Sequence, residues 1–402
     1  MKYYIVITPF FPTEESFRGS YIFDQVRAIE KTGRYKVVVF KSADNKIKKK
    51  SYEYQGITVY IFSFKRIKGG LLNNLLDGIN KRLFLEQFTQ TRIKVSDVAF
   101  VHCHCSNNVI YGLGLRSLNS EIKVLLQHHD LDPLGIHLEY FRFLKWNTRF
   151  KAWRKRVLFE QVDVHVCISQ WVKDYLYSYP EIRKGEVYQP FLHYMQMVKG
   201  TKSINIRNSY VLYNGVDLTI FHPMIGLKKK DVFTIGCIAN FQELKQHITL
   251  LKAVDILVNS GYKNLRLRLI GTGETLRDCE SFVYQHCLDM YVSFEKEVAH
   301  ERLSEYYNSL DLFVLPSVFE GFGCVYTEAA ACGVPFIGVF HQGAAEIIDP
   351  MEYKKWLIEP YDYNSLAMLI AEYYEKRCPQ KLCKTIEINT LIIEFLNYIE
   401  KV

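Results

Sequence analysis

The sequence lacks the long apolar runs, paired cysteines and biased composition that mark several classes of protein. No apolar stretch approaches the roughly 18 residues that spanning a bilayer requires. The ten cysteines are scattered singly apart from Cys103 and Cys105. Neither a disulfide framework nor a C-x-x-C zinc site is therefore indicated, and a reducing cytoplasm is the expected compartment. The short apolar run within residues 1–12 is expected to be a strand rather than a signal peptide.

The composition is that of a globular protein with more than one domain. Hydrophobic residues make up 49% and charged residues 23% of the 402 positions, which excludes a disordered or fibrous chain. Short β-rich apolar runs alternate with helical patterns, and this alternation starts again after residue 205. The pattern predicts two α/β domains, each with a parallel, doubly wound sheet. Their expected ranges are 1–205 and 206–380, with a helical segment at 381–402 that packs back on the first domain.

Charge is distributed unevenly along the chain. Residues 1–200 contain 31 Lys and Arg against 18 Asp and Glu, a net charge of +13, whereas residues 201–402 contain 20 against 25, a net charge of −5. The basic half is expected to face an anionic partner. Nucleic acid, an anionic membrane and a phosphorylated substrate all fit this charge.

The most informative segment follows an apolar run at 312–315. Gly321 and Gly323 allow backbone N–H groups to approach a ligand closely. A helix expected to begin near Cys324 would direct its positive N-terminus at a phosphate. Glu320 in the loop and Glu328 about one turn into the helix could accept hydrogen bonds from sugar hydroxyls. In an open α/β sheet such a loop, at the carboxyl end of a strand, is where ligands bind.

This segment resembles the E-x7-E signature of family 4 glycosyltransferases, with Glu320 and Glu328 as the two glutamates. Other segments resemble that family in the same order along the chain. They are the glycine loop at 10–20, the D-V…H-x-H strand at 97–104, His129 with Asp132, the N-G-V-D…F-x-P segment at 214–223, the phosphate loop at 235–245, the G-x-G-E turn at 271–274 and the segment at 342–347.

The resemblance implies the GT-B fold, in which two Rossmann-like domains face each other across a cleft. It also implies transfer of a hexose-type sugar from a nucleotide-diphosphate sugar, such as a UDP- or GDP-sugar, with retention and without a metal or other cofactor. The residues that it assigns to catalysis are His129, Glu320 and Lys245. Those that it assigns to the donor are Arg18, Gly19, Asn240, Lys245, Gly271, Gly273, Glu320, Gly321, Phe322, Gly323 and Glu328, with Glu328 on the ribose and Lys245 on the diphosphate.

Two positions depart from the family pattern. Asn240 stands where the family often has Arg, so Lys245 is expected to carry more of the diphosphate binding, helped by a cation such as Arg18. Asp130 stands where Gly is usual, which leaves open whether His128 or His129 faces the donor; the spacing to Asp132 favours His129.

Three further segments have both a functional and a structural interpretation. His102-Cys103-His104-Cys105 contains metal-ligand residues, but on a strand the histidines and cysteines point to opposite faces. Residues 65–83 and 140–159 combine apolar residues at helical spacing with many cations. Such segments are typical of helices on an anionic membrane surface. Alternatively, the apolar positions belong to the core and the cations to a solvated face.

The leading hypothesis is a retaining glycosyltransferase of surface polysaccharide or glycolipid assembly. It would be cytoplasmic and peripheral at the inner membrane face, acting on a saccharide or lipid-linked acceptor. A GT-B sugar-nucleotide epimerase is the main alternative. A basic nucleic-acid-binding protein is less favoured, because no helix-turn-helix, RRM or zinc-finger pattern is present. An NAD-dependent oxidoreductase is disfavoured, because Gly271-Thr272-Gly273 lacks the third glycine of G-x-G-x-x-G.

Overall fold

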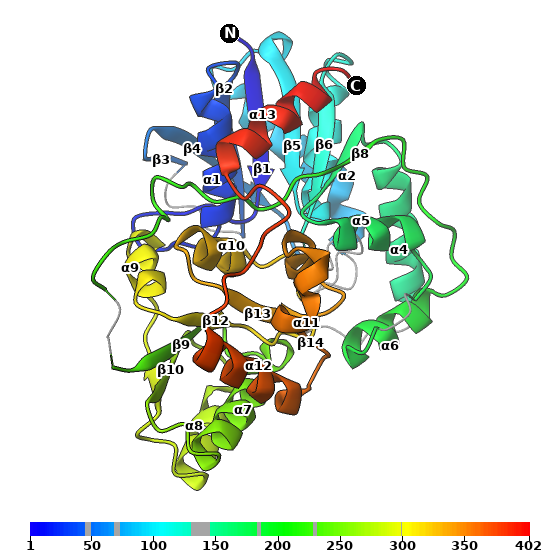
Figure 1. Cartoon of the computed structure of the whole chain (residues 1–402). Coiled ribbons are helices and arrows are strands. Elements are labelled where there is room, and N and C mark those ends of the chain that lie inside the picture. Colours follow the sequence, from blue (N-terminus) through cyan, green and yellow to red (C-terminus); the bar gives the residue numbers. More distant parts are fainter. Residues whose placement is uncertain (45–49, 68–72, 130–144, 183–185, 228–230, 299) are drawn as a thin grey trace. The chain divides into compact units, whose positions relative to one another are not determined.

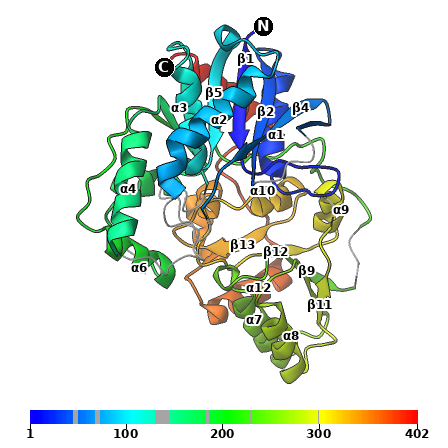
Figure 2. The same cartoon turned by 180° about the vertical axis from the view of Figure 1, so that it is seen from behind.

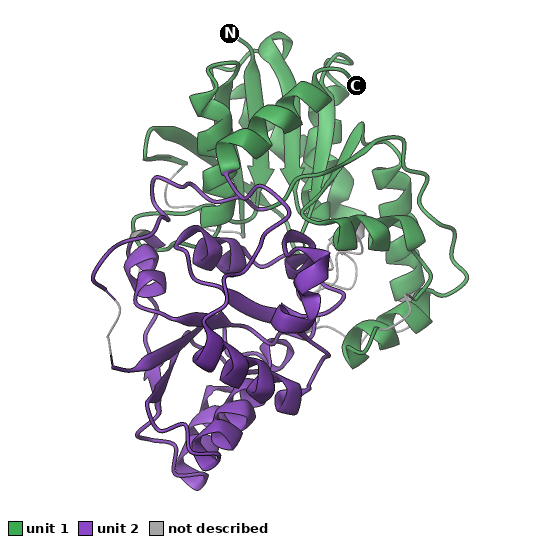
Figure 3. Ribbon diagram, viewed as in Figure 1, with its two compact units in different colours: residues 1–213, 388–402 green, residues 214–387 purple. Residues whose placement is uncertain are grey.

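A computed structural model describes residues 1–44, 50–67, 73–129, 145–182, 186–227, 231–298 and 300–402. The chain divides into two compact units (Figure 3). Unit 1 consists of residues 1–213 and 388–402, and unit 2 of residues 214–387.

The core of unit 1 is an eight-stranded sheet, counted over the described residues, with the order β3-β4-β2-β1-β5-β6-β7-β8. Neighbouring strands are parallel except for the antiparallel pair β3 and β4. The order reverses direction between β1 and β5, the kind of switch point beside which α/β sheets bind ligands. The strands are β1 (Tyr3–Thr8), β2 (Lys36–Asp44), β3 (Ser51–Tyr54), β4 (Ile57–Phe64), β5 (Val98–His104), β6 (Lys123–His128), β7 (Val164–Cys167) and β8 (Ser209–Val211).

Helices cover both faces of this sheet (Figures 1 and 2). On one face, α1 and α13 pack together over a core that includes Tyr4, Phe100 and Phe395. On the other face, α2 and α3 pack together, with Phe84 and Tyr111 against Phe62 of the sheet. The helices of unit 1 are α1 (Ser20–Lys31), α2 (Asp77–Thr89), α3 (Val109–Arg116), α4 (Lys145–Phe159), α5 (Gln170–Ser178), α6 (Gln189–Val198) and α13 (Ile388–Ile399).

Unit 2 contains a six-stranded parallel sheet, again counted over the described residues, with the order β11-β10-β9-β12-β13-β14. Its order reverses between β9 and β12. In Figures 1 and 2, α7, α8 and α12 lie on one side of the sheet and α9 and α10 on the other. The elements are β9 (Phe233–Ile238), α7 (His247–Asn259), β10 (Leu265–Ile270), α8 (Leu276–Gln285), β11 (Val292–Glu295), α9 (Leu303–Asn308), β12 (Leu312–Val314), α10 (Cys324–Ala331), β13 (Phe336–Val339), α11 (Tyr353–Trp356), β14 (Leu357–Ile358) and α12 (Tyr363–Lys376).

The observed fold agrees with the predicted pair of doubly wound α/β domains, but the boundaries differ from those expected. Unit 1 extends to Tyr213 rather than to residue 205, because β8 pairs with β7 and so completes the first sheet. Residues 381–387 stay with unit 2, where Val216 N–H donates a hydrogen bond to the Ile386 carbonyl. Strands β3, β8 and β14 are too short for the sequence periodicity to have predicted them.

Candidate functional site

In unit 2, the loops after β9 and β12 bring Lys245 and Glu320 together. The two strands are neighbours at the switch point of the sheet, so their carboxyl ends lie side by side. The loops are tied by the Ser317 hydroxyl and the Val318 N–H, which both donate to the Leu244 carbonyl, at 3.1 and 2.9 Å. Lys245 Nζ forms an ion pair with Glu320 Oε2. Two residues predicted from separate motifs therefore share one contact.

The Lys245–Glu320 pair is largely shielded from water. The exposed fraction of the side chain is 20% for Lys245 and 9% for Glu320. The positive N-terminus of α10 begins at Cys324, directly after this loop, as predicted. A buried ion pair beside a helix N-terminus is chemically suited to exchange one anion, the carboxylate, for another, such as a phosphate.

Glu328 lies within α10 and is itself mostly buried, with 8% of the residue exposed. Its Oε2 accepts a hydrogen bond of 2.7 Å from the Tyr307 hydroxyl. Its Oε1 lies 3.8 Å from His300 Nε2. The carboxylate is therefore held from one side by α9, a contact that the sequence motifs did not indicate.

Two of the predicted donor-binding glycines, Gly271 and Gly273, allow the loops after β9 and β10 to pack closely against each other. Gly271 and Gly273 have φ of 147° and 153°, and an added Cβ would lie 2.1 Å from the Ala239 carbonyl oxygen and 2.3 Å from that of Phe241. A side chain at either position would push apart the loops after β9 and β10. Close packing explains these glycines, and their contact with a donor stays a prediction.

The glycine-rich loop before α10 is equally crowded. Gly323 has φ of 78° and caps α10, and a Cβ there would lie 2.7 Å from the Tyr326 ring. The Gly321 carbonyl oxygen would lie 2.0 Å from a Cβ on Gly343, so two loops touch at their backbones. The Phe322 side chain is buried. Asn240, in contrast, is exposed.

In unit 1, Arg18 and Gly19 follow β1. The Arg18 guanidinium lies 3.9 Å from the centre of the Phe10 ring, a cation–π contact. Gly19 has φ of 92° and precedes α1, and a Cβ there would lie 2.8 Å from the Phe10 carbonyl carbon. Both residues thus fix the loop between β1 and α1 at the switch point of the first sheet.

The two adjacent histidines at the end of β6 have different environments. His128 is fully buried, and its Nε2 lies 2.9 Å from His165 Nδ1. His129 is partly exposed, and its Nε2 lies 3.1 Å from Nδ1 of the buried His104. His128 is therefore a core residue of unit 1, whereas His129 remains the candidate for contact with a substrate. Asp130 and Asp132 lie outside the described residues.

The histidines of the His-Cys-His-Cys segment point into the core. The Tyr4 hydroxyl lies 2.8 Å from His102 Nδ1, and burial lowers the pKa of His102 to about 3. Cys103 is buried beside Gly112. Among the described residues, no group of three His, Cys, Asp or Glu side chains is placed to hold a metal ion.

The two basic amphipathic segments expose part of their apolar residues. Helix α4 presents Phe150, Trp153 and Val157 with exposed fractions of 41%, 51% and 36%. Ile79 of α2 is 45% exposed. Residues 68–72 and 140–144 of these segments lie outside the described part of the chain. Within that part, no helix is both long and apolar enough to cross a bilayer.

Several of the predicted cations have intramolecular partners, which reduces the charge available to a ligand. Arg154 Nε donates to Asp77 at 2.7 Å and so joins α4 to the first residue of α2. Arg156 pairs with Glu160 at 2.9 Å. Lys65 and Arg66 are exposed.

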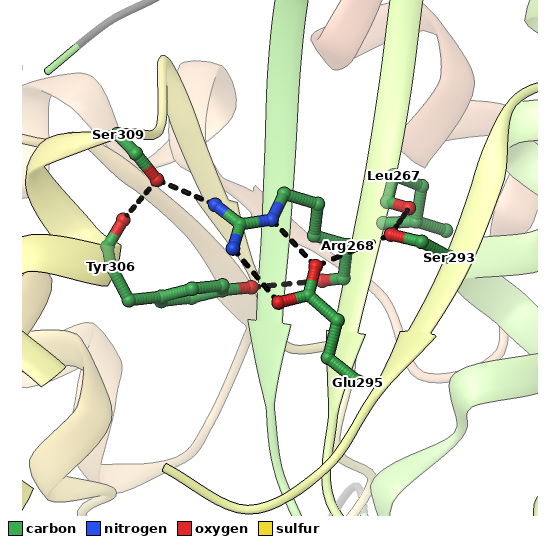
Figure 4. Close-up of polar contacts among 6 residues, drawn as sticks. All are labelled: Leu267, Arg268, Ser293, Glu295, Tyr306 and Ser309. Carbon is green, nitrogen blue, oxygen red and sulfur yellow. Dashed lines mark hydrogen bonds and ion pairs between the residues drawn. The ribbon is translucent and has the colours of Figure 1, made fainter. Parts of the chain in front are cut away.

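A second ion pair of unit 2 was not predicted (Figure 4). Arg268 of β10 donates to both oxygens of Glu295, at 2.6 and 2.8 Å, and its guanidinium lies over the Tyr306 ring. The Tyr306 hydroxyl donates back to the Arg268 carbonyl at 2.9 Å. These contacts fasten α9 to the sheet.

Residues 221–390 match the family model "Glycosyl transferases group 1". Among curated proteins, the chain is 33% identical over 147 residues to EpsF of Bacillus subtilis (strain 168), covering 34% of this chain and 38% of that protein. It is 30% identical over 138 residues to the capsular polysaccharide biosynthesis glycosyltransferase CapM of Staphylococcus aureus, covering 34% and 35%. The matches thus span little more than a third of these relatives.

Solved structures with the same fold cover the whole chain. Sucrose-phosphate synthase from Thermosynechococcus elongatus superposes with a TM-score of 0.71 at 18% identity, covering 100% of this chain and 99% of that one. Anabaena HepE in complex with UDP and glucose gives a TM-score of 0.67 at 15% identity, covering 100% of both chains. The two α/β units therefore have the Rossmann-like cores of GT-B proteins.

Proposed function

We propose that this protein is a retaining glycosyltransferase that transfers a hexose-type sugar from a nucleotide-diphosphate sugar to an acceptor. The observation that carries the proposal is the convergence of Lys245, Glu320 and the N-terminus of α10 at the switch point between β9 and β12. It is supported by the family match over residues 221–390 and by the similar fold of Anabaena HepE, whose structure is a complex with UDP and glucose. The glycosyltransferase relatives do not favour the epimerase alternative.

The chemistry of the proposed reaction requires stabilisation of a leaving nucleoside diphosphate. Negative charge accumulates on its phosphates as the bond to the sugar breaks. Lys245 and the backbone N–H groups that begin α10 would stabilise this charge, which is usually the largest single contribution to catalysis. Glu320 would then bind hydroxyls of the donor sugar, and Glu328 the ribose. His129 would lie near the reacting carbon. No metal or other cofactor is part of the proposal.

The proposed acceptor is a saccharide or a lipid-linked saccharide in surface polysaccharide or glycolipid assembly. The capsular polysaccharide role of CapM supports this choice. We also propose peripheral contact with an anionic membrane at the cytoplasmic face, through Phe150 and Trp153 of α4. Their rings lie 5.8 Å apart and are both exposed, as expected of aromatic side chains that enter a membrane interface.

A thermal-shift panel with UDP-, GDP-, ADP- and dTDP-sugars tests the donor class. We expect one nucleotide to raise the unfolding temperature well above the other three. A protein that responds to none of the four would contradict the proposal. Release of free nucleoside diphosphate only in the presence of an acceptor would distinguish transfer from epimerisation.

A further inference from the structure

Glu328 is enclosed by aromatic side chains from two other segments of unit 2. Tyr307 of α9, which is fully buried, donates its hydrogen bond to Oε2, and His300 lies on the side of Oε1. Phe221 is buried against both of these residues, with ring-centre distances of 5.4 Å to His300 and 6.1 Å to Tyr307. The Glu328 carboxylate thus lies against an aromatic wall formed by Phe221, His300 and Tyr307.

This wall is fixed to the helix that carries Tyr307. Asn308, the last residue of α9, donates from Nδ2 to the His222 carbonyl at 2.9 Å, and its Oδ1 accepts a 2.6 Å hydrogen bond from the Met224 N–H. Residues 221–224 and α9 are therefore joined by two hydrogen bonds. Groups that are already ordered in the free protein lose little conformational entropy when a ligand binds.

The Tyr307 hydroxyl can only act as a donor to this carboxylate. Burial, together with the neighbouring negative charge of Glu328, raises the pKa of Tyr307 well above its usual value. The proton therefore stays on Tyr307 over the whole physiological range. The hydrogen bond to Oε2 uses one of the carboxylate's acceptor sites and fixes its orientation, so the carboxylate can still accept a hydrogen bond from a ligand.

We infer that Tyr307 is a positioning residue that orients Glu328, so that one carboxylate oxygen accepts a hydrogen bond from a hydroxyl of the donor's ribose. The inference rests on the proposed function, since the ribose belongs to the nucleotide of the donor. Tyr307 contacts no substrate itself, and it acts through Glu328. It therefore determines how strongly the site distinguishes a ribose from a sugar without hydroxyls.

The neighbouring Tyr306 provides a matched control. It lies on the same helix, is 5% exposed, and donates its hydroxyl to the Arg268 carbonyl rather than to Glu328 (Figure 4). The variants Tyr307→Phe and Tyr306→Phe each remove one buried hydroxyl from α9. Only the first removes a hydrogen bond to the proposed ribose-binding carboxylate.

The test is calorimetric titration with the tightest binder among UDP, GDP, ADP and dTDP and with its 2′,3′-dideoxy analogue. We expect Tyr307→Phe to weaken binding of the parent nucleotide about tenfold, as for loss of a hydrogen bond to a charged group. Binding of the dideoxy analogue should stay at the wild-type value. Tyr306→Phe should change neither.

Equal weakening of both nucleotides by Tyr307→Phe would indicate a merely structural role and overturn the inference. So would a wild-type protein that binds the parent and the dideoxy nucleotide equally well. A wild-type protein that binds none of the four nucleotides would instead contradict the proposed function. If Tyr307→Phe fails to fold, Tyr307→Met removes the hydroxyl and fills the space with a flexible apolar side chain, while Glu328 is unchanged. This variant should produce the same selective loss, and full affinity in it would also overturn the inference.

Discussion

The ion pair between Lys245 and Glu320 predicts that Glu320→Gln binds a nucleoside diphosphate more tightly than the wild-type protein. In the free protein, the Glu320 carboxylate is paired with Lys245, the cation proposed to bind the diphosphate. Binding of the nucleotide must therefore separate the pair and bring two anions close together. The Gln side chain has nearly the same size and can still hydrogen-bond to Lys245, but it removes the competing charge.

The size of the effect follows from the charges and their burial. Two unit charges about 4 Å apart attract by about 4 kcal/mol at an effective dielectric constant of about 20. The desolvation of a pair as buried as this one offsets much of that attraction. If about a third remains as the cost of separating the pair, the gain on Glu320→Gln is about 1.4 kcal/mol, or tenfold in Kd. Turnover of the sugar donor should fall in the same variant, because Glu320 is proposed to bind the sugar.

Isothermal titration calorimetry of the wild type, Glu320→Gln, Lys245→Ala and the double variant measures this coupling. The double variant should bind no more tightly than Lys245→Ala alone, since the gain depends on the lysine. Glu295→Gln is the control, because it neutralises the glutamate of another ion pair of unit 2, that with Arg268. Its Kd should equal the wild-type value. If Glu320→Gln binds the nucleotide no more tightly than the wild type, the proposed competition for Lys245 is wrong.

Three further predictions concern the diphosphate, the membrane and pH. Lys245→Ala should weaken binding of the nucleoside diphosphate at least about tenfold and leave nucleoside binding unchanged; equal loss of both in calorimetry would reject a diphosphate role. The protein should co-sediment with phosphatidylglycerol vesicles at low salt and dissociate at high salt, and Trp153→Ser should weaken binding about tenfold. Tyr284→Ser, at an exposed aromatic residue of unit 2, should have no effect, and no sedimentation by the wild type would refute the membrane contact. Burial lowers the pKa of His102 to about 3 and that of His165 to about 4, so below pH 6.5 the unfolded chain binds more protons than the native one. As the pH falls from 6.5 to its native pKa, each histidine should then lower the free energy of unfolding by about 1.4 kcal/mol per pH unit. A free energy of unfolding in urea that is the same at pH 7.5 and pH 5.5 would contradict this.

The sequence by itself determined the fold class and the positions of the loops that carry the candidate site. Apolar runs of strand length separated by helical patterns are local features, and they located β1, β5, β9 and β12 within one or two residues. Because parallel strands place their carboxyl ends at one edge of a sheet, these runs also indicated where the ligand-binding loops lie. The glycine pattern and the two glutamates then marked the loop before α10.

The tertiary structure decided which of these residues contact one another. Lys245 and Glu320 are 75 positions apart, and only the adjacency of β9 and β12 brings their charges together. Tyr307 reaches Glu328 because α9 and α10 pack on the same side of the sheet, which no local pattern encodes.

The same holds for burial. Alternation along a strand places His128 and His129 on opposite faces, but the sequence cannot say which face packs against further side chains. In the structure, His128 meets His165 and Phe159 in the core, whereas His129 meets His104 and remains partly exposed. Side-chain burial depends on contacts between segments distant in sequence, so motifs identify the candidate residues and the packed fold selects among them.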